Sequence, residues 1–139
     1  MTIYYIYQLP YQLIEKIWHY LPMTTKIFIS RNDYIENHNV LYDNKIIKSR
    51  DNYIRDMIRN DYDFVFNFIV KESIYDWIRI RRIFYREIIY GSYLQYLMDL
   101  TVDHNASKCR KILMNEMSLC GLSKNLSKKK RIKNSKWTN

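Results

Sequence analysis

Few residues in this chain have types and spacing that could support chemistry. Cys109 and His104 lie close together in the sequence and pair a thiol with a possible base. The segment supplies no third group to orient that base. The sequence also lacks the Gly-x-Ser-x-Gly elbow, the P-loop and the His-Glu-x-x-His helix of common enzyme classes. We therefore expect a protein that is not an enzyme and has no cofactor.

The cysteines and histidines do not have the spacing of a disulfide or of a metal site. Cys109 and Cys120 lie 11 residues apart. On one helix this separation is about 16 Å, which a disulfide cannot span. His19, His38 and His104 have no paired spacing with these thiols of the kind that zinc sites use. The sequence predicts two free thiols and no bound metal.

A basic segment close to the end of the chain is its clearest charged feature. Its members are Lys128, Lys129, Lys130, Arg131 and Lys133. Cations of this kind displace counterions from a nucleic-acid backbone, so binding through them would be non-specific and would weaken with salt. The same run is typical of a nuclear-import signal and of a disordered, solubilising tail, and all three interpretations stay open.

Four arginines and two aromatic residues gather in a second basic segment. They are Arg79, Arg81, Arg82, Phe84, Tyr85 and Arg86. On the helix predicted here, Arg79, Arg82 and Arg86 share one face. That face is either the solvated side of an amphipathic helix or a basic and aromatic surface for nucleic acid.

Length and composition favour a folded, helical protein. The 139 residues suit one domain, since single domains usually have about 100 to 200 residues. Hydrophobic residues make up 47% of the chain, which is enough to build a core. Only 2 glycines and 2 prolines occur, which disfavours turn-rich sheet folds. The predicted fold class is all-α.

The net charge of +9 is concentrated in the tail. Residues 1 to 121 contain 16 basic and 14 acidic side chains, so we expect one nearly neutral helical domain there and a basic tail over 122 to 139. Every apolar run is interrupted before it reaches the roughly 18 to 20 residues of a membrane span. The N-terminus lacks the pattern of a secretory signal. We expect an intracellular protein without a membrane partner.

The clearest helical pattern covers residues 11 to 20. Five apolar residues follow the spacing i, i+1, i+4, i+5 and i+8, namely Leu13, Ile14, Ile17, Trp18 and Leu21. Pro10 suits the first turn of this helix, and Pro22 discourages its continuation. A second helix is predicted over 24 to 30, with Ile27 and Phe28 inward, and a third over about 32 to 39.

Packed helical hairpins are predicted over 50 to 120. The first helix is expected to begin at an Asp51 cap, with a stripe of Tyr53, Ile54, Met57 and Ile58. The next has a stripe of Phe64, Val65, Phe68 and Ile69, and a long helix over 74 to 90 is expected to end at Gly91. Two more helices are predicted, one with Tyr93, Leu94, Leu97 and Met98 inward, and one from a Ser107 cap through Ile112, Leu113 and Met117 to a stop at Gly121.

The apolar stripe of the first helix has a proline at each end. Leu9-Pro10, Leu13-Ile14, Ile17-Trp18 and Leu21-Pro22 form the pattern LP-x-x-LI-x-x-IW-x-x-LP. Over residues 8 to 42 the chain resembles the F-box family, and Ile27-Phe28-Ile29-Ser30-Arg31 is similar to that family's second half. The family usually has an aromatic residue two positions after that base, where this chain has Asp33 and then Tyr34.

The resemblance implies a three-helix module that binds a Skp-type adaptor protein and tethers a target to a cullin-RING ubiquitin ligase. The residues expected at the adaptor interface are Leu9, Pro10, Leu13, Ile14, Ile17, Trp18, Leu21 and Pro22. Residues 50 to 120 would face the target. The richness in Ile, Tyr, Asn and Lys resembles F-box-like products of large, low-GC DNA viruses, which implies work in the cytoplasm or nucleus of a host cell.

A second hypothesis stays open beside the first. The apolar stripe of residues 13 to 21 is also what the core of an ordinary helical domain requires. The chain would then be a basic structural or nucleic-acid-associated protein, packaged in a virion, with no ligase role.

Overall fold

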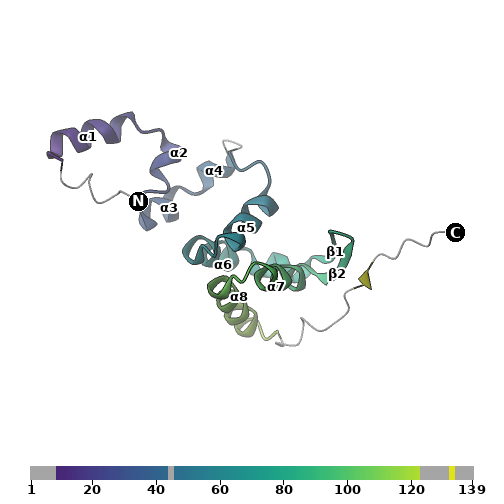
Figure 1. The fold of residues 1–139 in the computed structure, drawn as a ribbon. Helices are drawn as coiled ribbons and strands as arrows, with labels where there is room; N and C mark the ends of the chain where they lie inside the picture. Colours follow the sequence, from purple (N-terminus) through teal and green to yellow (C-terminus); the bar gives the residue numbers. More distant parts are fainter. Residues whose placement is uncertain (1–8, 44–45, 123–131, 134–139) are drawn as a thin grey trace. The chain divides into compact units, whose positions relative to one another are not determined.

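The computed structural model describes residues 9 to 43, 46 to 122 and 132 to 133. Within these ranges the chain is mostly helical, with eight helices and three short strands (Figure 1). The mostly helical prediction is confirmed, whereas the strands were not predicted. The chain divides into two compact units, residues 1 to 48 and 49 to 139, where the sequence predicts one helical domain over 1 to 121.

The first unit contains four short helices. They are α1 (Tyr11–Tyr20), α2 (Met23–Lys26), α3 (Arg31–Asn37) and α4 (Asn39–Asp43). The first has the predicted bounds. The second ends earlier than predicted, and the third is followed directly by α4, which the sequence did not predict.

The core of the first unit is small and lies after α1. Its buried side chains are Ile27, Tyr34, His38 and Leu41. The ring of Tyr34 stacks on that of His38, with centroids 5.7 Å apart. The inward orientation of Ile27 is confirmed, but the same prediction for Phe28 is wrong, because this side chain is 54% exposed.

A local hydrogen-bond pair explains why Asp33 occupies its position. The Oγ of Ser30 accepts a hydrogen bond from the backbone N–H of Asp33 at 3.1 Å, and the Ser30 hydroxyl donates to the Asp33 carboxylate at 2.7 Å. The first of these bonds caps the start of α3, and the second links the side chains of the same two residues. The aromatic residue one position later, Tyr34, is the one that enters the core.

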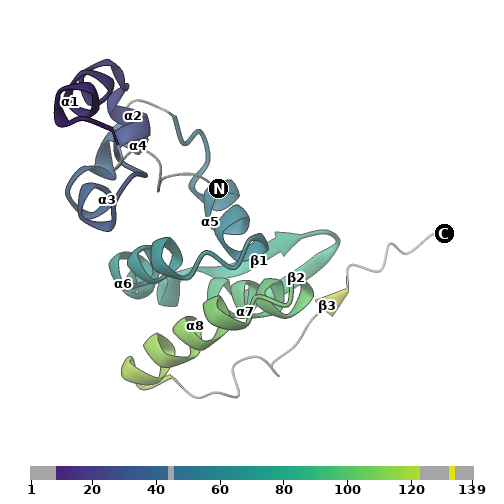
Figure 2. The same ribbon diagram turned by 60° about the vertical axis from the view of Figure 1, so that its left-hand side comes forward.

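The second unit combines four helices with a small sheet (Figure 2). Its elements are α5 (Arg50–Arg59), α6 (Asp63–Arg79), β1 (Arg81–Tyr85), β2 (Ile88–Ser92), α7 (Tyr93–Asp103), α8 (Ser107–Leu119) and β3 (Ile132–Lys133). The sheet is antiparallel with strand order β1-β2-β3. Tyr85 pairs with Ile88 across the turn between the first two strands.

The prediction of one long helix over 74 to 90 is wrong beyond Arg79. Residues 81 to 92 form the β1–β2 hairpin instead, so the arginines share no helical face, and Gly91 lies within β2 rather than at a helix end. In β1, Ile83 and Tyr85 are half-buried while Phe84 between them is exposed. This alternation has the period of two that a strand requires.

Helix α7 is the centre of the second unit. Nine of its eleven residues are buried. It packs against α5, α6 and α8 and against both strands of the hairpin. The burial includes polar residues, since Gln95, Asp99 and Thr101 are buried together with the apolar ones. The predicted inward residues Tyr93, Leu94, Leu97 and Met98 are all buried.

Aromatic contacts attach the hairpin to α7. The ring of Tyr96 lies 5.1 Å from that of Tyr85 on β1 and 5.4 Å from that of Tyr90 on β2, measured between centroids. Tyr93 lies between Tyr96 and Trp77 of α6, with centroid distances of 5.6 Å and 5.4 Å. Aromatic pairs at these separations add about 0.5 to 1.5 kcal/mol each to the effect of burial.

In α5 and α6 the inward faces match the predictions in part. Ile54 and Ile58 are buried as predicted, but Ser49, not Asp51, caps α5 by accepting a hydrogen bond from the N–H of Asn52. Of the predicted stripe of α6, Ile69 is buried and Phe64, Val65 and Phe68 are half-buried. Phe66 is the fully buried aromatic side chain of this helix. It belongs to a buried face that extends along the helix as far as Trp77.

Three helices of the second unit end in the same way. Asp61, Asn105 and Gly121 each follow a helix with a positive φ, of 50°, 53° and 70°. At each end, two backbone N–H groups return to carbonyls of the last turn, which is the Schellman arrangement. The predicted stop at Gly121 is therefore confirmed.

The side chain of Asp61 also caps the N-terminus of α8. Its carboxylate accepts the backbone N–H of Cys109 at 2.9 Å and that of Lys108 at 3.3 Å. The predicted Ser107 cap is wrong, since Ser107 is the first residue of the helix and the residue before it, Ala106, makes no side-chain cap. One residue thus closes α5 and caps α8.

Replacing Asp61 with alanine should destabilise the second unit by about 1 to 2 kcal/mol, because both the cap and a residue tolerant of positive φ are lost. Urea unfolding followed by circular dichroism measures this change. Asp61→Asn is the matched control, since asparagine tolerates the same backbone and retains one acceptor. Equal stability of the alanine variant and the wild type would contradict the capping role.

The capping role also predicts a pH dependence. Burial raises the pKa of Asp61, but the N–H groups of Cys109 and Lys108 more than offset this effect, so its pKa is lowered overall. A carboxyl group whose pKa is lowered by folding stabilises the folded protein at pH values above its ordinary pKa. This contribution to stability is lost as the pH falls through the pKa of the folded state. The stability difference between wild type and Asp61→Asn should therefore shrink between neutral pH and about pH 3. A stability difference between the two proteins that stays constant with pH would contradict the capping role.

Candidate functional site

Helix α1 exposes an unusually apolar surface. None of its ten residues is buried. Leu13, Ile17 and Trp18 are 46%, 39% and 39% exposed, and Leu9 just before the helix is 38% exposed. The described part of the first unit thus leaves the stripe uncovered. A gathered set of large apolar side chains on a surface is typical of an interaction site.

The ends of α1 are defined by its flanking residues. The carbonyl of Pro10 accepts the N–H groups of Leu13 and Ile14, at 2.9 Å and 3.2 Å. The N–H of Leu21 returns to the carbonyls of Ile17 and Trp18. A ten-residue helix is marginal in water unless packing stabilises it, so a partner that covers its stripe would also stabilise its fold.

The eight predicted interface residues lie in α1 or directly beside it in the chain. Six of them are exposed: Leu9, Pro10, Leu13, Ile17, Trp18 and Pro22. Ile14 and Leu21 are half-buried. The ammonium of Lys26 lies 5.7 Å from the centroid of the Trp18 ring, which joins α2 to the edge of this surface.

Sequence reasoning missed two exposed apolar side chains close to α1 in the chain. Met23 is 44% exposed and Phe28 is 54% exposed. Met23 directly follows the second proline of the motif, a signal that could have included it. The exposure of Phe28 had no such signal, because an apolar residue beside the buried Ile27 looks equally suited to the core.

The predicted basic tail lies mostly outside the described residues. This holds for Lys128, Lys129, Lys130 and Arg131, whereas Lys133 belongs to β3. The arginines of the second basic segment lie at the end of α6 and in the β1–β2 hairpin, and Arg79, Arg81, Arg82 and Arg86 are all exposed.

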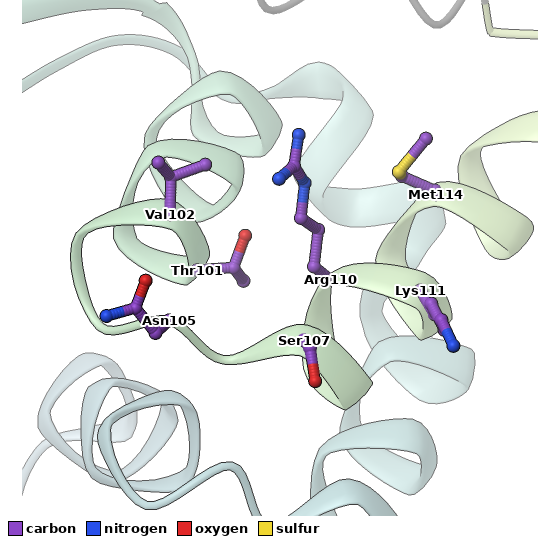
Figure 3. Close-up of a pocket in the computed structure, with 7 residues that line it drawn as sticks. All are labelled: Thr101, Val102, Asn105, Ser107, Arg110, Lys111 and Met114. Carbon is purple, nitrogen blue, oxygen red and sulfur yellow. The ribbon is translucent and has the colours of Figure 1, made fainter.

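A pocket in the second unit lies between α7 and α8 and has a volume of about 410 Å³ (Figure 3). It is lined by Thr101, Val102, Asn105, Ser107, Arg110, Lys111 and Met114. The Arg110 side chain lies between the two helices. Thr101 already donates its hydroxyl hydrogen to the carbonyl of Met98 at 2.7 Å, so it is not free to donate to a ligand.

Both cysteines are free thiols. Cys109 is fully buried, and burial, with a smaller effect of Asp61, raises the pKa of its thiol to about 12. Its Sγ lies 3.9 Å from the carbonyl oxygen of Met57 on α5. At neutral pH this thiol is protonated, which does not suit a nucleophile.

Two absences hold for the described residues. They contain no group of three or more His, Cys, Asp or Glu side chains arranged to hold a metal ion. None of their helices has the length and apolar character needed to cross a bilayer.

Comparison with known proteins found no matching family model, no matching curated protein and no matching solved structure.

The exposure of α1 predicts that polar substitutions there cost little stability. Leu13→Glu should change the free energy of unfolding by about 1 kcal/mol or less, since the site is half exposed and a first-turn carboxylate suits the helix dipole. Leu41→Ala, in the core of the same unit, should cost about 2 to 5 kcal/mol. Amide hydrogen exchange in α3 measures the change in the free energy of unfolding for both variants. A cost for Leu13→Glu as large as that for Leu41→Ala would mean that α1 is core.

Proposed function

We propose that the first unit is an F-box-like interaction module that binds a Skp-type adaptor through α1. The observation that carries the proposal is the absence of any buried residue in α1, combined with its stripe of large apolar side chains. The alternative, that the stripe is core, is less well supported, because the core of this unit consists of Ile27, Tyr34, His38 and Leu41. The proline-bracketed pattern and its resemblance to the F-box family favour the Skp-type adaptor as the partner.

The energetics suit a helix that docks with its apolar side. Covering the exposed parts of Leu13, Ile17 and Trp18 would remove each from water, with a gain of roughly 1 to 2 kcal/mol per side chain. These gains must offset the loss of translational and rotational freedom on association. Leu9 and Met23, both exposed, extend the apolar surface at the two ends of the helix.

The second unit is proposed to carry the target of a cullin-RING ubiquitin ligase. Its rigid centre, the buried helix α7, would hold a target-binding surface in a fixed geometry. The proposal assigns a binding role and no catalytic one, and it implies work inside a host cell, in the cytoplasm or the nucleus. A viral origin is part of the same proposal and is supported by the richness of the sequence in Ile, Tyr, Asn and Lys.

The test is binding of the purified full chain to a purified Skp-type adaptor, measured by isothermal titration calorimetry. Ile14→Asp combined with Ile17→Asp should abolish detectable binding. A charge in the centre of an apolar interface costs at least about 2 kcal/mol per site, and 1.4 kcal/mol corresponds to about tenfold in affinity.

The matched control is Glu15→Lys, which reverses a charge on the opposite side of the same helix and should leave the affinity within about threefold of the wild type. Circular dichroism of each variant verifies that it is folded. Wild-type protein that does not bind the adaptor, or binding that survives both aspartates, would refute the proposal.

A further inference from the structure

The β1–β2 hairpin is the most positively charged surface among the described residues of the second unit. Between residues 79 and 87 the chain has four exposed arginines, Arg79, Arg81, Arg82 and Arg86, and a single acid, Glu87. The adaptor interface proposed above does not involve this hairpin. Its charge therefore calls for a separate explanation.

The same segment of the chain contains an exposed aromatic side chain. Phe84 is 62% exposed, and Arg82 and Arg86 are two residues before and after it on the same strand and turn. The neighbouring Ile83 and Tyr85 are half-buried and pack against the core. The fold therefore presents Phe84 outward at the cost of leaving a large ring in water, which a stacking ligand would cover.

Arginine also lies over an aromatic ring at the same hairpin. The guanidinium carbons of Arg86 and Arg55 are each 5.2 Å from the centroid of the Tyr85 ring. These contacts hold the long side chain of Arg86 close to the strand, so less rotamer freedom would be lost when it meets an anion.

The turn of the hairpin has an unfavourable sequence for its geometry. Arg86 and Glu87 have φ values of 46° and 64°, and two successive positive values between paired strands are typical of a type I′ turn. Such turns prefer Asn-Gly, because other side chains are strained there. A third arginine, Arg82, has a φ of 56°. Arginine thus occupies two positions where backbone geometry favours other residues.

The most basic sequence of the chain leads directly into this sheet. β3 (Ile132–Lys133) pairs with β2, with Lys133 opposite Ile88 and Ile132 opposite Ile89 (Figure 2). The four residues that precede it are Lys128, Lys129, Lys130 and Arg131. The basic run thus directly precedes the third strand of this sheet in the sequence.

We propose that the β1–β2 hairpin binds single-stranded nucleic acid, with Arg81, Arg82 and Arg86 at phosphates and Phe84 stacked on an unpaired base. An exposed ring among arginines supplies stacking and phosphate contacts together, which is the combination that single strands require. An acidic protein or an anionic membrane would use the charge alone. The hairpin also lacks the broad apolar face with which amphipathic segments enter a bilayer.

The experiment is fluorescence anisotropy of the full chain with a labelled single-stranded RNA of about 20 nucleotides, titrated between about 50 and 200 mM salt. Phe84→Ala should weaken binding about tenfold without changing the salt dependence. Arg81→Gln with Arg82→Gln should lower the slope of log K against log salt by about 0.7 per residue. Arg59→Gln on α5, an exposed arginine paired with Asp56, is the matched control and should bind as the wild type does.

A fourth variant separates binding from folding. Arg86→Asn with Glu87→Gly supplies the preferred turn sequence, so it should raise the thermal unfolding midpoint while weakening RNA binding. Lower affinity together with higher stability cannot come from a misfolded hairpin.

Several outcomes would overturn the proposal. They are no RNA binding at about 50 mM salt, an affinity unchanged by Phe84→Ala and by the arginine substitutions, and binding to anionic vesicles or polyaspartate that equals RNA binding and is insensitive to Phe84→Ala. Loss of binding only when Lys128 to Arg131 are neutralised would assign the activity to the tail and would also overturn it.

Discussion

The burial of nine of the eleven residues of α7 is the constraint on which the second unit depends. Over these nine residues, Tyr93 to Thr101, the helix has no side that water can solvate, so every direction around this part must be filled by other elements. Three helices and both strands of the hairpin do so. The hairpin is therefore part of the core construction, and its inner face, with Tyr85 and Tyr90 against Tyr96, is determined by α7. The outer face of the hairpin does not pack against α7, so packing does not determine its residues.

The two units use apolar residues in opposite ways. In the second unit the large side chains of α7 are buried by neighbours within the chain, and the side-chain oxygen of the buried Gln95 accepts the N–H of Gly91 at 3.1 Å. In the first unit α1 has a comparable share of apolar residues but no neighbour that buries any of them. Stability within the molecule explains the first arrangement. The proposed contact of the stripe with another molecule would explain the second.

Local patterns in the sequence predicted the helices well but not the turns between them. The spacing of apolar residues indicated α1, α5, α7 and α8, because side chains at these intervals lie on the same side of a helix. Residues 80 to 90 fit a helix and a strand equally, and the contact that decides, between the hairpin and Tyr96 of the helix that follows it, is not contained in the spacing of apolar residues. The cap of α8 is a similar case, since Asp61 lies 48 residues before Cys109. The composition of α1 could be predicted, but its exposure could not, because a core stripe and a docking stripe have the same spacing.

The position of β1 at one edge of the three-stranded sheet has a consequence for self-association. An edge strand carries backbone groups that can pair with a strand of a second molecule, and proteins commonly oppose this with charge. Arg81 and Arg82 lie on this edge strand, beside apolar and aromatic residues of high strand propensity such as Ile83 and Phe84. Mutual repulsion of these cations would hinder two hairpins from joining edge to edge. The same charges would therefore keep separate copies of the protein from aggregating.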